Sequence, residues 1–171
     1  KNYNSAVSYY QMGDYQNAIN SLNKSITIDK NFIEAWLLLG DINADLKKYQ
    51  EAINAYNGAI GIDSTFFPPV YYFLGGIYYE ISEYYKSIKC LEVFLNTDNI
   101  SSEIKELASD KLIRAQTAFR LISNPIPVDI ISMGYPVNTP DDEYINYVNV
   151  DNDLIMFTKR SPSKSSSKRY V

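Results

Sequence analysis

The sequence predicts an all-α solenoid of three helix-turn-helix pairs and a capping helix, followed by a short β-hairpin. Three observations support this prediction: a repeat with a period of 34 residues, apolar residues at helical spacing within each copy, and a change of composition after Pro125. We accordingly divide the 171 residues into a solenoid with its capping helix at 1–123, a proline-containing linker at 124–143, and a hairpin with its tail at 144–171.

The repeat is visible when the sequence is aligned with itself. Residues 2–32 match 36–66 at an offset of 34, and the matched pairs include Tyr15/Tyr49, Ala18/Ala52, Ile19/Ile53, Ile26/Ile60 and Asp29/Asp63. The third copy needs an offset of 35, which pairs Gly40 with Gly75 and places one extra residue within 66–69. We therefore expect helix pairs at 2–12 and 15–28, at 34–46 and 49–62, and at 69–81 and 84–96.

The residues at the repeating positions resemble the tetratricopeptide repeat, whose pattern is W-x2-L-G-x2-Y followed by A-x3-F. The matching residues are Trp36, Leu39, Gly40, Ala52, Leu74, Gly75, Tyr78 and Ala18. Small residues of this pattern stand where the two helices of a pair cross, because a larger side chain would separate them. The resemblance covers residues 2 to about 100 and implies a protein-binding scaffold without catalytic activity. The proline that usually closes each repeat is replaced by Lys30, Ser64 and Asn99.

A further helix is expected at 102–122, with Ser101 or Ser102 as its N-cap and Asn124-Pro125 as its end. Its apolar residues follow a spacing of three and four, and they are Ile104, Leu107, Ala108, Leu112, Ala115 and Phe119. A solenoid needs such a helix to cover its last apolar face. The same helix equally fits the opening of a degenerate fourth repeat.

After Pro125 the pattern changes to prolines and then to two runs of β-forming residues, at 144–150 and 154–158, separated by a turn at 151–153. This segment is similar to the opening blade of the WD40-like β-propellers that follow tetratricopeptide repeats in Bacteroidetes envelope proteins of the OmpA family, the PorE-like group. A blade has four strands, so we expect the chain to be part of a longer protein. The resemblance implies a periplasmic, outer-membrane-associated location and a possible role in type IX secretion. A cytoplasmic adaptor without an envelope role is the alternative, and an enzyme domain beyond Val171 is a third interpretation.

The composition argues against several classes of function. There are 16 basic and 20 acidic residues without a basic cluster, which disfavours nucleic acid as a partner. The absence of His and the single cysteine, Cys90, remove the commonest catalytic bases and metal ligands. The acidic residues at 141–143 lack the spacing of a calcium loop, so a solvated turn is the preferred interpretation. We expect no catalytic residues, no metal or cofactor, and no direct insertion into a membrane.

The resemblance also implies where a partner binds, because the first helices of the pairs form the concave face of such solenoids. The candidate groove residues are Tyr3, Val7, Tyr10, Glu34, Leu37, Asp41, Asp45, Tyr72, Tyr79 and Glu80. This lining is aromatic and acidic and contains no Lys or Arg, so we expect an extended protein or peptide segment that is apolar or mildly basic. The alternative is that several of these tyrosines only pack between helices. Two segments of the chain itself are candidate ligands, the linker 124–140 and the basic tail 159–169.

Overall fold

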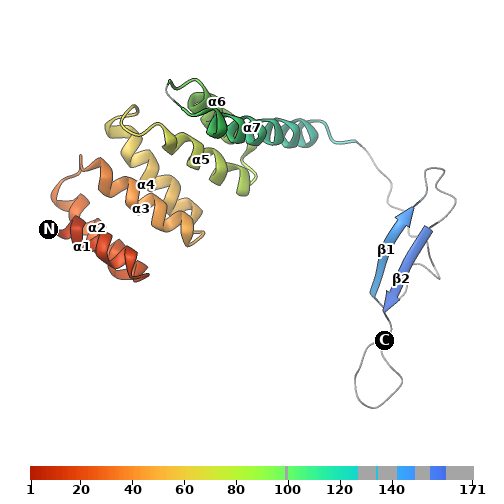
Figure 1. Ribbon diagram of the computed structural model, residues 1–171, viewed down its shortest axis with the longest axis horizontal. Coiled ribbons are helices and arrows are strands. Elements are labelled where there is room, and N and C mark those ends of the chain that lie inside the picture. The colour runs from red at the N-terminus through yellow and green to blue at the C-terminus, as the bar shows by residue number, and fades with distance from the viewer. Residues whose placement is uncertain (99, 127–133, 135–141, 149–154, 161–171) are drawn as a thin grey trace, which may run out of the picture. The chain divides into compact units, whose positions relative to one another are not determined.

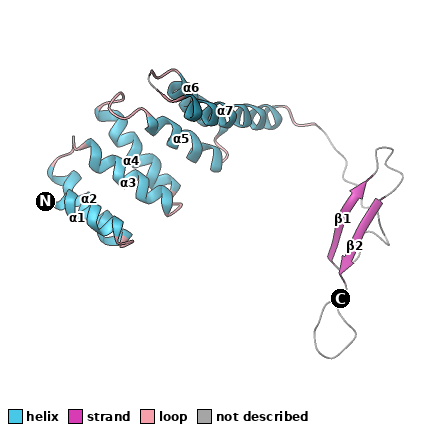
Figure 2. Cartoon of the chain, viewed as in Figure 1, coloured by secondary structure: helices cyan, strands magenta, loops and turns pink. Residues whose placement is uncertain are grey.

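The structure, a computed structural model, describes residues 1–98, 100–126, 134, 142–148 and 155–160. The chain divides into two compact units, Lys1–Pro125 and Ile126–Val171, and each is described by itself. In the described residues the first unit is helical and the second contains two strands (Figure 2). The predicted boundaries of the linker, at 124 and 143, stay a prediction.

The helical unit is a succession of antiparallel helix pairs, as Figure 1 shows. Its helices are α1 (Asn2–Gln11), α2 (Tyr15–Ile28), α3 (Ile33–Asp45), α4 (Tyr49–Ile62), α5 (Pro69–Glu80), α6 (Tyr84–Leu95) and α7 (Ser102–Ser123). Each helix starts and ends within one residue of the prediction. The predicted all-α solenoid is therefore confirmed. None of the described helices combines the length and the apolar character needed to cross a lipid bilayer.

The turn inside each helix pair has the same geometry in all three repeats. Its central residue has a positive φ, which is 76° at Gly13, 56° at Lys47 and 63° at Ser82. The amide of that residue donates to the carbonyl three positions earlier, and the next amide donates to the carbonyl five positions earlier. These bonds satisfy carbonyls that the end of the helix leaves without an intrahelical donor. The repeat at the level of sequence is thus a repeat of turn geometry as well.

The core consists of small residues at the helix crossings and larger side chains that fill the space beside them. Ala18 and Ala52 are fully buried, as are the larger side chains Leu22, Tyr56 and Leu91. Burying one such Leu side chain contributes about 1.5–3 kcal/mol to folding. The ring of Tyr56 lies against the backbone of Gly40, where a Cβ would overlap it.

The other residues of the repeat pattern also lie in or beside this core. Leu91 lies against Gly75, where a Cβ would be only 2.7 Å from Leu91 Cγ. The Trp36 indole nitrogen donates to the Lys30 carbonyl at 3.0 Å. Leu39 and Leu74 are buried, and the half-buried Tyr78 packs against the core. The repeat pattern therefore corresponds to contacts between neighbouring helices.

Helix α7 packs on α6 in the place that the first helix of a fourth repeat would take. Ala108 and Ala115 are fully buried and seven residues apart, as are the buried pairs Ala35/Ile42 and Val70/Ile77 on α3 and α5. Five residues after the first member of each pair, α3 and α5 have Gly40 and Gly75, whereas α7 has Ile113, which is 59% exposed. A bulky residue thus occupies the position at which a second helix crosses in the other repeats. Of the two candidate N-caps, Ser101 accepts the hydrogen bond from the Ile104 amide at 3.4 Å.

The second unit contains β1 (Asp142–Val148) and β2 (Ile155–Arg160), which pair antiparallel. Asp142 pairs with Arg160 at one end and Val148 with Ile155 at the other, with an irregularity between Ile145 and Tyr147. Strand β1 begins and ends two residues earlier than the predicted run 144–150. The predicted turn at 151–153, the acidic residue Asp141 and most of the linker lie outside the described residues.

The crossing at Gly40 yields a first prediction. Replacing Gly40 with Ala puts a methyl group into the ring of the buried Tyr56, and overpacking of this kind costs about 1–3 kcal/mol. Gly61 is the matched control, because it lies in α4 with no atom within 4 Å of its would-be Cβ. Gly61→Ala should raise the free energy of unfolding by up to about 1 kcal/mol, since Ala is the better helix former. Urea denaturation measures both, and an equally stable Gly40→Ala variant would show that the crossing is not tightly packed.

The packing of α7 yields a second prediction. Ala115→Glu forces a long charged side chain into the contact with α6 and should cost about 1–3 kcal/mol from overpacking alone. Gln116→Glu makes the same charge change one residue later at an exposed position and should be nearly neutral. Amide hydrogen exchange along α7 is the measurement, with faster exchange expected only in the Ala115 variant. Equal exchange in the two variants would contradict the docking of α7 through its alanines.

Candidate functional site

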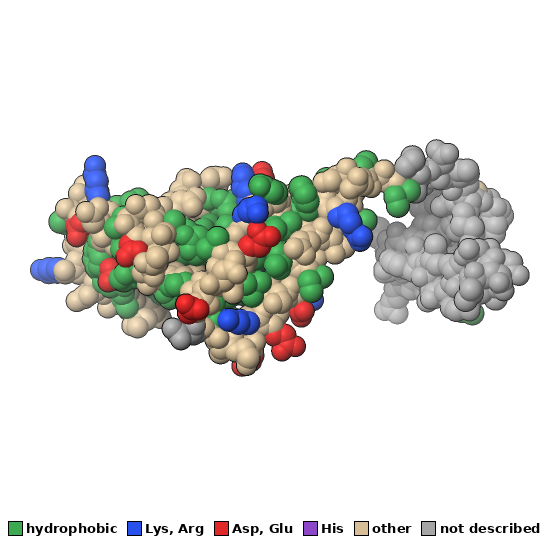
Figure 3. All heavy atoms as spheres, turned by 90° about the horizontal axis from the view of Figure 1, so that it is seen from above, with side chains coloured by type: hydrophobic (Ala, Val, Ile, Leu, Met, Phe, Trp, Pro, Cys, Tyr) green, Lys and Arg blue, Asp and Glu red, His purple; other side chains and the backbone are tan. Residues whose placement is uncertain are grey.

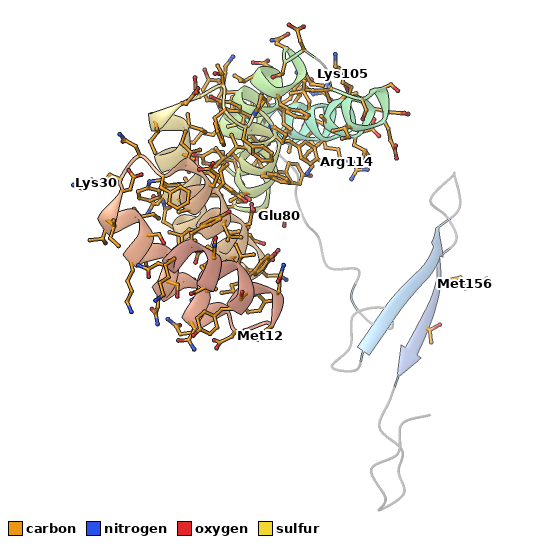
Figure 4. The ribbon with its side chains drawn as sticks, turned by 60° about the vertical axis from the view of Figure 1, so that its left-hand side comes forward. Met12, Lys30, Glu80, Lys105, Arg114 and Met156 are labelled. Atoms are coloured by element: carbon orange, nitrogen blue, oxygen red, sulfur yellow. The ribbon has the colours of Figure 1, made fainter. Side chains whose placement is uncertain are left out.

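A groove of about 540 Å³ runs along the helical unit, between residues of α1, α3, α5 and α7 with contributions from α4. Six of the ten predicted residues line it, namely Tyr10, Asp41, Asp45, Tyr72, Tyr79 and Glu80. Figure 4 labels Glu80 at the end of α5 and Arg114 on α7, and both side chains are exposed. The groove is therefore assembled from residues that are as much as 101 positions apart, from Tyr10 to Lys111.

The other four predicted residues do not line this groove. The ring of Tyr3 packs on Phe32 with centroids 4.9 Å apart, in a separate hollow at the start of the chain. Leu37 packs against the core around Ala52 and Tyr56, because it lies on the side of α3 that faces the next repeat. Val7 is half-buried and Glu34 is exposed on the first turn of α3. The repeat positions from which the groove residues were predicted thus identify the face of each helix. They do not show how far the hollow extends along that face.

Two carboxylates lie one helical turn apart on α3, and each accepts a hydrogen bond from a tyrosine. Tyr56 Oη donates to Asp41 Oδ1 at 2.7 Å, and Tyr10 Oη donates to Asp45 Oδ2 at 2.9 Å. Tyr10 belongs to the first repeat and Asp45 to the second. Within the described part of the chain, neither carboxylate forms a salt bridge with Lys or Arg. The groove therefore contains two carboxylates that accept hydrogen bonds from phenols but have no salt-bridge partner among these residues.

The surroundings shift the pKa values of these groups. Burial raises the pKa of Asp41, the charge of Asp45 raises it further, and the hydrogen bond from Tyr56 lowers it, with a net upward shift. The hydrogen bond to Asp45 raises the pKa of Tyr10 to about 12, with burial as the next cause. Burial, followed by the charge of Asp41, also raises the pKa of Tyr56. Both phenols are therefore neutral donors at physiological pH.

Aromatic rings form the wall of the groove next to the carboxylates. Phe73 stands at its centre, with ring centroids 6.3 Å from Tyr56, 6.5 Å from Phe67 and 6.0 Å from Tyr72. Phe67 and Phe73 are exposed by 39% and 40%. Figure 3 shows one face of the helical unit, on which hydrophobic side chains are interspersed with acidic and basic side chains. These ring faces are apolar surface that a ligand can cover.

The expectation that the lining has no Lys or Arg is wrong. Lys111 of α7 lines the groove, and its Nζ lies 4.2 Å from the centroid of the Tyr72 ring. Lys111 follows Ala108 by three residues, as Phe73 follows Val70 in α5. It was missed because the groove positions were assigned only in the three complete repeats, although α7 continues the row of first helices.

Tyr56 and Phe67 also line the groove, although they are not among the residues predicted for it. Tyr56 belongs to the second helix of its pair, and its phenol reaches Asp41 beside Gly40. Phe67 lies in the loop that contains the extra residue of the third copy. Two features of the sequence could have indicated these residues. For Tyr56 the feature is an aromatic residue opposite a Gly at the helix crossing, and for Phe67 it is a loop insertion rich in aromatic residues.

The remaining candidates for reactivity are possible metal ligands and the thiol of Cys90, and Cys90 does not line the groove. Among the residues that the structure describes, no cluster of three or more His, Cys, Asp or Glu side chains is placed to hold a metal ion. Cys90 packs against the core of the second and third repeats, and burial raises the pKa of its thiol to about 11. The thiol is therefore protonated at neutral pH and has the character of a packing residue.

The raised pKa of Asp41 predicts an unusual effect on stability. The stabilising contribution of a carboxyl group with a raised pKa is fully present below its ordinary value of 3.8 and is lost as the pH rises through the raised pKa. Asp41→Asn keeps an acceptor for the Tyr56 hydroxyl, so we expect its Tm to exceed that of the wild type at pH 7 but not at pH 3. Tyr56→Phe should lower the Tm, because the hydrogen bond to a charged group is worth roughly 1 kcal/mol or more. A lower Tm of Asp41→Asn at pH 7 would refute the cost assigned to this charge.

Comparison with known proteins supports the fold of this unit. The family model described as "Anaphase-promoting complex, cyclosome, subunit 3" matches residues 1–59. A comparison with curated proteins finds no match.

Solved structures match most of the helical unit. The first TPR of Spaghetti (RPAP3), bound to the HSP90 peptide SRMEEVD, is 18% identical over 70% of this chain and 90% of its own, with a TM-score of 0.60. The Yersinia enterocolitica type III secretion chaperone SycD, in complex with a peptide of the translocator YopD, is 21% identical over 68% of this chain and 90% of its own, with a TM-score of 0.60. The TPR2B domain of yeast Sti1, in its pHsp70 complex, is 21% identical over 66% and 90%, with a TM-score of 0.57. The helical unit therefore has the fold of tetratricopeptide repeats.

Proposed function

We propose that the helical unit is a protein-interaction scaffold whose groove holds an extended polypeptide with basic and apolar side chains. The observation that carries this proposal is the pair Asp41 and Asp45, which accept hydrogen bonds from tyrosines but have no salt-bridge partner among the described residues. The pair lies beside a wall of exposed rings. Two solved structures with a similar fold include a bound peptide, and a third is a complex with pHsp70, which supports a polypeptide as the ligand class.

The chemistry of the groove favours a cationic side chain at the carboxylates. Each carboxylate oxygen accepts more than one hydrogen bond, so Asp41 and Asp45 retain acceptor capacity beside the tyrosine hydroxyls. A guanidinium or ammonium group there gains charge attraction of about 1 kcal/mol for each exposed contact. The faces of Phe73 and Tyr72 offer apolar burial to the rest of the segment. Charge attraction and apolar burial both stabilise a bound ligand, and neither is a step in a chemical reaction. We therefore propose a binding module and not an enzyme.

The setting of this scaffold is a second part of the proposal. The sequence pattern at 131–160 supports a propeller blade and with it a periplasmic, outer-membrane-associated protein of the PorE-like kind, and the strands β1 and β2 fit this interpretation. A cytoplasmic adaptor remains the alternative. Most of the linker 124–140 and most of the tail 159–169, proposed as intramolecular ligands, lie outside the described residues, and their role stays a prediction.

The groove is tested with the double variant Asp41→Asn, Asp45→Asn and a pool of random ten-residue peptides displayed on beads. The wild-type chain should enrich peptides that contain Lys or Arg, and the variant should lose this enrichment. With a single selected peptide, the loss of each contact should weaken binding about fivefold, and added salt should weaken the wild type more than the variant.

The matched control is Glu51→Gln with Glu103→Gln, which changes the charge equally at two exposed positions outside the groove. This control should bind like the wild type. Enrichment of basic peptides that falls equally in the double variant and in the control would mean that the net charge, and not the groove, attracts them. Enrichment that is equal in all three proteins would refute the role of Asp41 and Asp45. A pool without any enrichment would refute the scaffold function of this face.

A further inference from the structure

A second hollow, of about 410 Å³, adjoins the groove at its α7 end. It is bounded by α5, α6 and the start of α7, and its walls include Pro69, Tyr72, Phe73, Phe94, Ile104 and Leu107. Ser101 also lines it, but its side chain already accepts the hydrogen bond that caps α7. The hollow thus offers a ligand almost no polar group, in contrast to the groove beside it.

The walls of this hollow carry apolar surface that faces solvent. Leu107 is 55% exposed, Ile104 is 44% exposed and Phe73 is 40% exposed. Exposed apolar side chains gathered around one concavity are typical of surfaces that a ligand covers. Because the lining lacks charge, a Leu, Met or Phe side chain fits it, whereas a charged side chain would lose its hydration there without gaining a partner.

The two hollows share a wall, because Tyr72 and Phe73 line both. Tyr56 connects this wall to the acidic pair, since its ring centroid lies 6.3 Å from that of Phe73 and its hydroxyl lies 2.7 Å from Asp41. The acidic pair and the apolar hollow are therefore two side-chain contacts apart. An extended chain rises about 3.3 Å per residue and turns alternate side chains to the same face, so it spans this separation in two to four residues.

Lys111 determines where a cationic side chain of the ligand can bind. Its ammonium group lies over Tyr72 and lines the groove but not the apolar hollow. A ligand cation placed on Tyr72 would meet this ammonium group and be repelled. The favourable place for the cation is consequently at Asp41 and Asp45, on the other side of Phe73.

We propose that the hollow at Leu107 is a second subsite, which takes a bulky apolar side chain located two or four residues from the Lys or Arg that faces Asp41. The ligand of the scaffold is then a two-point motif of one basic and one apolar residue at even spacing. This inference rests on the proposed function, since it adds a requirement to the same peptide.

The test uses the full chain and fluorescent ten-residue peptides of Ser, Thr and Gln that contain one Arg, one Leu, or both at spacings of one to five. Anisotropy titrations should show that Arg with Leu at spacing two or four binds roughly tenfold more tightly than Arg alone. Odd spacings should give little of this gain. Leu107→Ser should abolish the gain from Leu but leave the binding of the Arg-only peptide unchanged.

The matched control is Ile113→Ser, because Ile113 lies on the same helix and is 59% exposed, against 55% for Leu107, but does not line the hollow. It should keep the full gain. If the Arg-only peptide binds through Asp41 and Asp45 but Leu adds nothing, or adds equally in the Leu107 variant, the second subsite is overturned and the proposed function stands. If no peptide binds, the proposed function fails and this inference fails with it. If Leu-only peptides bind as tightly as the two-point peptides, the coupling of the two subsites is overturned.

Discussion

The crossing of α3 and α4 at Gly40 is the contact on which the candidate site depends. Because Gly40 has no Cβ, the ring of Tyr56 lies against the backbone of α3, and its hydroxyl reaches Asp41 on the groove side. The next repeat has the same crossing at Gly75, but Leu91 fills it and the hydroxyl of Ser87 donates to the Gly75 carbonyl at 2.7 Å. The same backbone geometry therefore supports a phenol–carboxylate pair in one repeat and a sealed core in the next.

The charged form of Asp41 is electrostatically unfavourable in its surroundings. Burial and the neighbouring charge both favour the neutral form of Asp41, and the hydrogen bond from Tyr56 offsets this only in part. Groups that reduce the stability of a fold in this way cluster at functional sites, where binding makes use of them. The tyrosines have a second role, since Tyr10 joins the first repeat to the second through Asp45. Recognition groups and contacts between repeats are thus the same side chains.

The sequence was sufficient to predict the fold of the helical unit because its repeat combines apolar spacing, small residues and turns at fixed positions. Three of the residues predicted for the groove, Tyr72, Tyr79 and Glu80 of α5, line the hollow that the structure shows, since their placement depends only on the face of one helix. The prediction failed at Lys111 and Tyr56, whose positions depend on contacts between elements. Lys111 belongs to a helix without a visible repeat motif, and Tyr56 crosses from the second row of helices into the first. Leu37 shows the opposite error, because an apolar residue at a groove position was drawn into the neighbouring core.

The loop before α5 shows how a repeat array acquires a new surface. The one extra residue of the third copy falls at 66–69, at the junction between the loop and the first residue of α5, so it leaves the apolar spacing within each helix unchanged. It nevertheless brings Phe67 beside Phe73 at 6.5 Å on the open side of the stack. An insertion of this kind changes the surface that the repeats offer to a ligand, while the packing between their helices stays the same. Evolution can therefore diversify the ligands of such an array by changing the length of its connecting loops while its helices stay interchangeable.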